Sequence, residues 1–330
     1  MPATKPLQGE PPVFPVLLHR REAMAEDVAR YEFVAPDGVE LPPFEAGAHI
    51  DVVIAPEYQR AYSLAGDPAD RSRYVLGVLN EPQGRGGSAL MHRAFREGRQ
   101  VFIGRPVNHF PLDEGAPLSL LFAGGIGVTP LIAMAHRLHA LGRDFHLHYS
   151  ATSRATAGFL DELARAPWAG HVQLHLKDEG GRADLAALVP PHEPGWQLYT
   201  CGSARYMDAV FAAATVQGWT EQALHREYFQ LPEAPERVKH LFQLKLARSG
   251  RMLQVPAEHS ATEVLAQAGV AVPIKCSDGL CGVCAVAYDA AASSPVDHRD
   301  VVLGAAERER RIILCCSRAA DEGGTLVLDL

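Results

Sequence analysis

The stretch IKCSDGLCGVCAV, residues 274–286, holds three of the six cysteines in the chain. They are Cys276, Cys281 and Cys284, and two more, Cys315 and Cys316, follow as an adjacent pair. A disulfide framework, a zinc site and an iron–sulfur cluster all use closely spaced cysteines. Each of these implies a different fold for this part of the chain, and the spacing of the cysteines distinguishes them.

Four residues separate Cys276 from Cys281, and two separate Cys281 from Cys284. This is the spacing of plant-type [2Fe–2S] clusters, which take one further thiolate from a distant part of the chain. Structural zinc sites usually use two close pairs, whereas only Cys281 and Cys284 form such a pair here. The spacing therefore favours a [2Fe–2S] cluster over zinc or plain core cysteines, and it leaves Cys315 and Cys316 both open as the fourth ligand.

Two glycines, Gly279 and Gly282, lie between the clustered cysteines. Without a Cβ atom, a glycine adopts positive φ at little cost. We expect both glycines to do so, which would let the loop wrap tightly and turn backbone N–H groups towards the cluster sulfurs.

The bulk composition is that of a soluble globular protein of two or three domains, with 330 residues, 47% hydrophobic and 21% charged. The net charge of −8 argues against nucleic acid as a partner. No apolar run approaches the roughly 20 residues of a membrane span. The start of the chain, MPATKPLQGEPP, lacks the apolar core of a secretion signal. We therefore expect a cytoplasmic protein with reduced thiols, which weakens the disulfide alternative.

The pattern of apolar and polar residues changes twice along the chain. Residues 13–112 carry short alternating runs such as YEFVA and HIDVVI, broken by Gly and Pro, which predict a β-barrel or sandwich. From about residue 115, strands such as the fully apolar LSLLFA alternate with helices, which predicts a doubly wound α/β domain. Residues 230–240 are rich in proline and charge and are typical of a linker. A hairpin, a short helix and a final strand then surround the cysteines.

Two helix starts carry capping signals. Thr129 stands as a candidate N-cap with Pro130 at the first helical position, and Gly142 marks the expected end of that helix. Farther on, Ser260 and Glu263 form a capping box ahead of the short helix VLAQAG.

Three other stretches are candidate nucleotide-binding sites. GGIGVTP, residues 124–130, follows a buried strand and opens a helix, although Pro130 replaces the last glycine of the GxGxxG pattern and no ribose-binding acid follows at the usual distance. GRGGSALMH, residues 84–92, places Arg85 and Ser88 at a helix start, where an anion would bind. RAYSLAG, residues 60–66, offers Arg60 and two hydroxyls on a strand. Each alone is also compatible with an ordinary turn or core strand, and their order along the chain is what makes them informative.

Taken together, the sequence resembles the phthalate dioxygenase reductase family, which includes the vanillate demethylase reductase components. The resemblance runs from about residue 13 to the C-terminus. The matching elements are RAYSLAG, GRGGSALMH, NHFPL, AGGIGVTPLIAMA, YTCGSARYMDAV, HREYF, CSDGLCGVC, DHRDVVL and CCSRA.

The resemblance implies three domains: an antiparallel FMN-binding β-barrel over residues 1–113, a doubly wound NADH-binding α/β domain of the ferredoxin–NADP reductase type over 114–232, and, after a linker at 233–240, a β-grasp [2Fe–2S] ferredoxin domain over 241–330. The FMN site it implies consists of Arg60, Ala61, Tyr62, Ser63, Gly77, Val78, Arg85, Gly86, Gly87, Ser88, Thr129 and Phe229. The NADH site it implies consists of Gly124, Gly125, Gly127, Thr129, Cys201 and Gly202.

In the family, the cysteine two places before Ser-Arg is the fourth cluster ligand. The implied ligands are therefore Cys276, Cys281, Cys284 and Cys315, with Cys316 as a buried neighbour. Ser63, Thr129 and Cys201 are expected nearest to the redox relay, and no residue is expected to act as a general acid or base.

The implied function is that of a reductase component of a multicomponent oxygenase. A nicotinamide gives up two electrons as a hydride, a [2Fe–2S] cluster takes one at a time, and a flavin between them serves both. The resemblance further implies a transient Rieske-type oxygenase partner, and we expect a monomer because all three redox centres lie in one chain. The alternative is an NAD(P)H-dependent electron-transfer or redox-sensing protein without a dedicated oxygenase, and a zinc-bearing flavoprotein is a weaker one. Arg154 could meet the 2′-phosphate of NADPH or be an ordinary solvated arginine.

Overall fold

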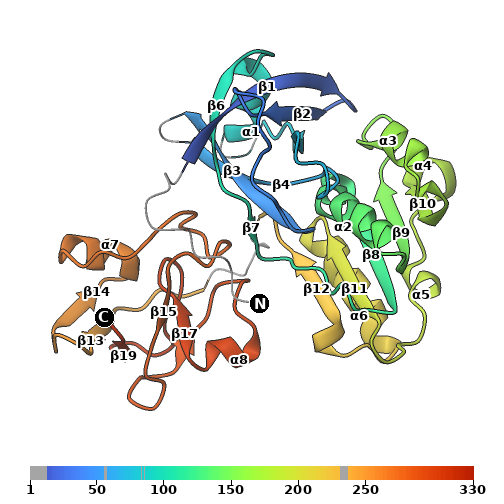
Figure 1. The fold of residues 1–330 in the computed structure, drawn as a ribbon. Coiled ribbons are helices and arrows are strands. Elements are labelled where there is room, and N and C mark those ends of the chain that lie inside the picture. Colours follow the sequence, from blue (N-terminus) through green and yellow to red (C-terminus); the bar gives the residue numbers. More distant parts are fainter. Residues whose placement is uncertain (1–12, 56–57, 83, 85, 231–236) are drawn as a thin grey trace. The chain divides into compact units, whose positions relative to one another are not determined.

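The computed structural model describes residues 13–55, 58–82, 84, 86–230 and 237–330, and the chain forms two compact units, residues 1–227 and 228–330. The first unit begins with an antiparallel sheet in the order β4-β3-β6-β1-β2-β5, with β7 paired to β3 (Figure 1). The isolated bridge between Leu64 and Leu76 joins the two ends of this order, so the sheet closes into a barrel, as predicted. Its elements are β1 (Val13–Ala23), β2 (Val28–Val34), β3 (Ala48–Ala55), β4 (Tyr58–Ser63), β5 (Tyr74–Leu79), α1 (Gly87–Ala94), β6 (Gln100–Gly104) and β7 (Val107–Asn108).

The second half of this unit is a parallel sheet in the order β10-β9-β8-β11-β12. The apolar strand β8 lies at its centre, which explains why it needs no polar face. The strand order reverses between β8 and β11, and such a switch point is where open α/β sheets bind ligands. The elements are β8 (Leu118–Gly124), η1 (Gly125–Gly127), α2 (Val128–Ala140), β9 (Asp144–Ala151), α3 (Leu160–Arg165), η2 (Ala169–His171), β10 (Val172–Leu176), α4 (Lys177–Gly180), α5 (Leu185–Leu188), β11 (Gln197–Cys201), α6 (Ala204–Val216), η3 (Glu221–Ala223) and β12 (Leu224–Glu227).

The predicted start of helix α2 was wrong. The 3-10 turn η1 runs directly into α2, so Gly127 takes the cap position and Pro130 is the third helical residue. The hydroxyl of Thr129 donates to the carbonyl oxygen of Ile126 at 3.0 Å and caps no N–H group. The helix ends at Ala140, and Gly142 follows with φ of 63°, as the stop signal predicted.

One hydrophobic core joins the barrel to the parallel sheet, and a second cluster that includes Phe122, Leu198 and Val210 packs α6 against the sheet. The first core extends from barrel residues such as Phe33 and Ile50 to Leu131 in α2 and Leu147 in β9. The parallel sheet and the barrel are therefore parts of one compact unit, and the division of this unit at residue 113 stays a prediction. Within the part of the chain that the structure describes, no helix is both long and apolar enough to cross a membrane.

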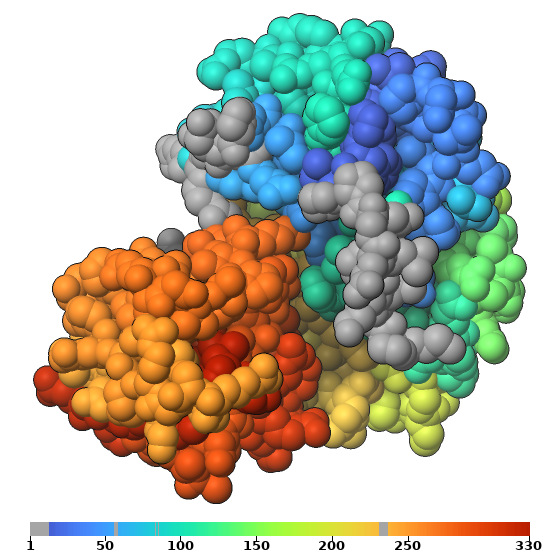
Figure 2. All heavy atoms as spheres, turned by 60° about the vertical axis from the view of Figure 1, so that its left-hand side comes forward, coloured from blue at the N-terminus to red at the C-terminus, as the bar shows by residue number. Residues whose placement is uncertain are grey.

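The second unit contains the cysteine stretch and a small mixed sheet in which β13 pairs with β14 and β19. The predicted capping box of Ser260 and Glu263 is present at the start of α7. Figure 2 shows red atoms of the chain's end partly covered by orange segments of the same unit, which agrees with the pairing of β19 and β13. The elements are β13 (Phe242–Leu246), β14 (Met252–Val255), α7 (Ala261–Gln267), β15 (Ala285–Ala287), β16 (Val296–Asp297), α8 (Ala305–Arg308), β17 (Arg311–Ile313), β18 (Arg318–Ala319) and β19 (Thr325–Leu328).

Candidate redox centres

The strand β4 and the start of α1 meet at Arg60 and Gly87. A Cβ atom on Gly87 would lie 2.9 Å from Cγ and 3.3 Å from Nε of Arg60, so a larger residue at this position would have to displace the arginine side chain. Gly86 precedes the helix with φ of 83°, a conformation that favours glycine. The result is a helix N-terminus beside a guanidinium, which is the arrangement that binds a phosphate group. The residues present thus fit the predicted FMN phosphate site.

Other predicted flavin residues flank this cradle. The hydroxyl of Ser88 accepts a hydrogen bond from the backbone N–H of Glu81 at 3.1 Å. On β4, Ala61 is exposed and Tyr62 half-buried. Arg85 lies outside the described residues. Phe229 belongs to the second unit and is 37% exposed, and its part in the flavin site stays a prediction.

Gly77 on β5 links the barrel to the parallel sheet. A Cβ atom there would come within 2.6 Å of both Cγ2 of Thr129 and the ring of Phe159. The neighbouring Val78 is fully buried. The structure therefore brings Gly77 and Thr129, which are far apart in sequence, into direct contact. Phe159 escaped the sequence analysis because nothing in FLDELARA distinguishes it from an ordinary core residue.

The glycine turn after β8 packs against the end of β11. A Cβ atom on Gly127 would lie 2.2 Å from the carbonyl oxygen of Cys201, and one on Gly202 would lie 3.0 Å from the Cα atom of Gly124. Open space surrounds the Cα atom of Gly125. The five predicted NADH residues of this turn and strand end therefore come together at the switch point of the sheet. Their close backbone approach fits the binding of a dinucleotide.

A carboxyl group that the sequence analysis missed lies at the same point. Glu227 ends β12 in register with Cys201, and the hydroxyl of Ser63 donates to its Oε2 at 3.1 Å. The residue as a whole keeps some exposure, but its carboxyl group lies deep enough for burial to raise its pKa to about 7. Burial and the nearby Glu227 raise the pKa of the Cys201 thiol, so this thiol stays protonated. The signal was available, because Glu227 lies in HREYF, two residues before Phe229.

A second residue that the sequence analysis missed covers the glycine turn. The ring of Tyr206, in the first turn of α6, would come within 2.9 Å of a Cβ atom on Gly124, and its hydroxyl donates to Oγ of Ser150 at 3.4 Å. Its ring therefore lies on the backbone that the dinucleotide is expected to approach.

In the second unit, the four predicted cluster cysteines converge. The Cys281 and Cys315 thiols donate hydrogen bonds to the Cys276 sulfur and lower the pKa of Cys276, whose thiolate form they stabilise. The Cys315 thiol also contacts Cys284. Cys281, Cys284 and Cys315 are buried, whereas Cys276 is half-buried. The fold thus brings Cys315 next to Cys284 although thirty residues separate them in the sequence, as the fourth-ligand prediction requires.

The loop around these cysteines has the expected backbone. Gly279 and Gly282 adopt φ of 78° and 70°, which confirms that prediction. The N–H of Asp278 donates to Sγ of Cys276 at 3.4 Å, and backbone N–H groups of Leu280 and Val283 donate to Cys276 and Cys281. Such N–H···S bonds stabilise thiolates and tune the potential of a bound cluster.

Four thiolates are the ligand set of a plant-type [2Fe–2S] cluster, so the cysteines that converge here fit such a cluster. Cys316 contacts Cys315, but it is half-buried, less than the buried neighbour that was predicted.

The comparisons with known proteins agree with these two units. The family model described as the 2Fe-2S iron-sulfur cluster binding domain matches residues 244–320. The chain is 45% identical over 314 residues to the tert-butanol monooxygenase / tert-amyl alcohol desaturase reductase subunit of Aquincola tertiaricarbonis, with 91% of each chain covered. The solved structure of phthalate dioxygenase reductase matches with a TM-score of 0.70 at 37% identity, over 96% of this chain and 98% of that one.

A longer protein contains a similar part. An intact type IV self-sufficient cytochrome P450 monooxygenase matches with a TM-score of 0.85 at 36% identity. The match covers 96% of this chain but only 41% of that one, so this chain spans less than half of the longer protein.

Proposed function

The chain belongs to the phthalate dioxygenase reductase family, and we propose that it delivers electrons from NADH to a Rieske-type oxygenase. It is an oxidoreductase of the class that serves as the reductase component of oxygenase systems, with FMN, NADH and a [2Fe–2S] cluster as its redox groups. The observation that carries the proposal is the convergence of four cysteine thiols in one unit and, in the other, of the Gly124–Gly127 turn with Cys201, which lies in register with Glu227 and its partner Ser63.

Residues of the first unit would hold the two nucleotides. Arg60 and the backbone at Gly86 and Gly87 would hold the FMN phosphate, and the turn at Gly124–Gly127 with Gly202 would hold NADH. When bound, the flavin takes a hydride from NADH and passes the electrons on singly. Cys276, Cys281, Cys284 and Cys315 would hold the cluster that receives them.

The part played by Glu227 is electrostatic. The Ser63 hydroxyl orients its carboxyl group, and the carboxylate form would favour the positive charge that a nicotinamide ring gains when it gives up a hydride. Because the pKa of Glu227 is about 7, both forms are populated near neutral pH. The protonated thiol of Cys201 beside it would fill space without acting as a nucleophile.

The partner and the setting complete the proposal. A Rieske-type acceptor and a transient complex are proposed from the family resemblance, and a monomeric reductase from the presence of all three redox centres in one chain. A cytoplasmic location is proposed with them. The domains at residues 1–113, 114–232 and 241–330 are proposed to carry FMN, NADH and the cluster.

The match to a self-sufficient cytochrome P450 monooxygenase favours a second candidate, in which the acceptor is a haem protein. The two candidates differ in the centre that receives the electron and share everything before it.

The test mixes the NADH-reduced protein anaerobically with a purified Rieske-type oxygenase and, separately, with a purified cytochrome P450, and follows each acceptor by stopped-flow absorbance. Flavin and iron are assayed on the same sample, with one FMN and two irons expected per chain. Faster reduction of the Rieske centre supports the proposal, and faster reduction of the haem overturns the Rieske assignment. A Cys281→Ser variant that still reduced either acceptor at the full rate would overturn the route through the cluster.

A further inference from the structure

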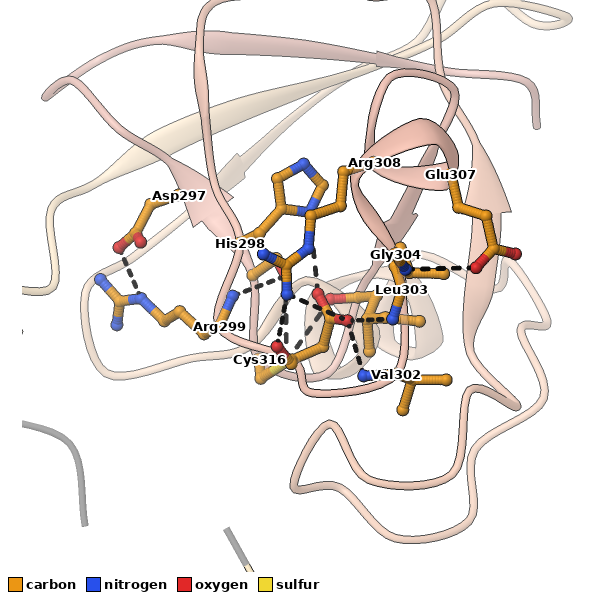
Figure 3. A network of polar contacts seen from close by, with 12 residues as sticks. Asp297, His298, Arg299, Val302, Leu303, Gly304, Glu307, Arg308 and Cys316 are labelled. Atoms are coloured by element: carbon orange, nitrogen blue, oxygen red, sulfur yellow. Dashed lines mark hydrogen bonds and ion pairs between the residues drawn. The ribbon is translucent and has the colours of Figure 1, made fainter. Parts of the chain in front are cut away.

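A buried carboxylate lies beside the cysteine loop of the second unit. The side chain of Asp300 is fully buried, and its Oδ1 accepts hydrogen bonds from the backbone N–H groups of Val302 at 3.1 Å and Leu303 at 2.7 Å. Figure 3 shows these bonds within a network that also includes His298 and Arg308. Burying a charge is costly unless it is hydrogen-bonded, so these two bonds hold the turn from Asp300 to Leu303 in one conformation.

This turn rests directly on the cysteine loop. The N–H of Val301 donates to the carbonyl oxygen of Gly279 at 3.3 Å. A Cβ atom on Gly279 would lie 3.2 Å from the Cα atom of Asp300, and one on Gly282 would lie 3.1 Å from Cγ1 of Val302. The two glycines that let the loop wrap are therefore the two places where the turn touches it. A shift of the turn would reach both.

The end of the turn packs on two of the cysteines. Leu303 is buried in one apolar cluster with Ile313, Cys284 and Cys315. Its position depends on the bond from its own N–H to Asp300, the shorter of the two. Leu303 thus excludes water from the side of the site where Cys284 and Cys315 lie. Solvent exposure is one of the factors that set the reduction potential of an iron–sulfur cluster.

Arg308 holds Asp300 from the other side. It donates from Nη2 to the carbonyl oxygen of Asp300 at 2.8 Å, and the same nitrogen lies 3.8 Å from its Oδ1. Nδ1 of His298 lies 3.7 Å from Oδ2 of the carboxylate, which is too far for a hydrogen bond, and among the described residues neither atom has another hydrogen-bond partner. The hydroxyl of Tyr288 donates to the carbonyl oxygen of Arg308 at 2.8 Å. The carboxylate is therefore held from both ends of the segment that covers the cysteine loop.

Asp289 in the same unit forms a turn of the same kind, with its side chain bound to backbone N–H groups two and three residues later. Its Oδ1 accepts from the backbone N–H groups of Ala291 at 3.0 Å and Ala292 at 3.1 Å, but Asp289 is exposed and its turn belongs to none of the contacts with the cysteine loop described above. An aspartate that merely stabilises a turn would resemble Asp289. Asp300 differs in its burial, its basic neighbours and its contact with the loop.

We propose that Asp300 is a positioning residue for the [2Fe–2S] cluster, which holds the 300–303 turn against Gly279 and Gly282 and so sets the potential of the cluster and its resistance to loss. The inference rests on the proposed function, in that Cys276, Cys281, Cys284 and Cys315 hold the cluster. A buried negative charge close to the cluster also disfavours the reduced state, which carries one more electron.

The test compares Asp300→Ala and Asp300→Asn with wild type and with the matched control Asp289→Ala, using the full-length protein. Three quantities are measured: the reduction potential of the cluster, the electron paramagnetic resonance spectrum of its reduced form, and the rate at which a chelator removes iron. A fourth, the reactivity of the thiols in the iron-free protein, needs no loaded cluster.

Asp300→Ala is expected to lose iron at least about tenfold faster, the usual effect of removing a group that supports metal ligands. Its potential should become more positive, its resonance spectrum should change and its iron-free thiols should react faster, while Asp289→Ala matches wild type. Asp300→Asn keeps an oxygen acceptor of the same shape but not the charge, so it should shift the potential with a smaller effect on iron loss, and it serves if Asp300→Ala does not fold.

The inference is overturned if both Asp300 variants match Asp289→Ala in potential, spectrum and iron release. A wild-type protein that bound no iron would instead overturn the proposed function. The two failures are therefore distinguished in the same experiment.

Discussion

Replacing Glu227 by glutamine should make the first unit more stable at about pH 8 and leave it almost unchanged at about pH 4. Burial raises the pKa of this carboxyl group from 4.5 to about 7. One pKa unit corresponds to about 1.4 kcal/mol, so ionising Glu227 in the folded chain costs at most about 3.5 kcal/mol. The raised pKa means that the folded chain holds a proton that the unfolded chain has already lost. The cost is thus absent below pH 4.5, grows up to about pH 7 and is complete above it.

The measured difference should lie below this limit. Glu227 keeps some exposure, and glutamine accepts a weaker hydrogen bond from Ser63 than a carboxylate does. We therefore expect Glu227→Gln to gain about 1–3 kcal/mol relative to wild type at about pH 8. Urea unfolding followed by tryptophan fluorescence isolates the relevant unit, because all three tryptophans, at positions 168, 196 and 219, lie in it.

The control is Glu221→Gln, at an exposed position of the same unit. It should change stability equally at both pH values. If Glu227→Gln also behaved in this way, the argument that the carboxyl group is buried would be refuted.

In stopped-flow experiments, the rate of flavin reduction by NADH should rise in wild type as pH passes about 7. Glu227→Gln should be slower and lack this rise, and an unchanged profile would contradict the electrostatic role.

Cys281→Ser should abolish the visible absorption of the cluster but keep flavin bleaching by NADH, whereas Cys316→Ser should keep both; anaerobic spectra that showed the reverse would exchange the roles of these residues. Gly127→Ala should slow flavin reduction by NADH about tenfold or more in stopped-flow measurements, because its Cβ atom would lie 2.2 Å from a backbone carbonyl oxygen of β11. Glu179→Gln should raise kcat/KM for NADPH relative to NADH about fivefold in steady-state assays, because it releases Arg154, whose Nε lies 2.7 Å from Oε1 of Glu179. An unchanged ratio would mean that Arg154 does not meet the 2′-phosphate.

Local features of this protein were predictable because they depend on neighbours along the chain. The spacing of Cys276, Cys281 and Cys284 indicated a cluster loop, and the positive φ angles of its glycines followed from the need to wrap it. The capping box at Ser260 was equally local. The start of α2 was misjudged at Thr129, since the preceding turn continues into the helix and the threonine hydroxyl donates to the carbonyl oxygen of Ile126 instead of accepting from a backbone N–H group as a cap does.

The sequence by itself therefore predicted the order of the folding units and the glycine turns, and the cysteine ligand set, which came from a family resemblance, stays a prediction. Only the tertiary structure decided which residues from distant parts of the chain come into contact. Ser63 and Glu227 are 164 positions apart, and their hydrogen bond depends on how the barrel packs on the parallel sheet. Asp300 reaches Gly279 only because the fold returns the chain to the cysteine loop. Periodicity and spacing describe a residue's neighbours in sequence, whereas the burial that raises the pKa of Glu227 comes from segments that no local pattern connects.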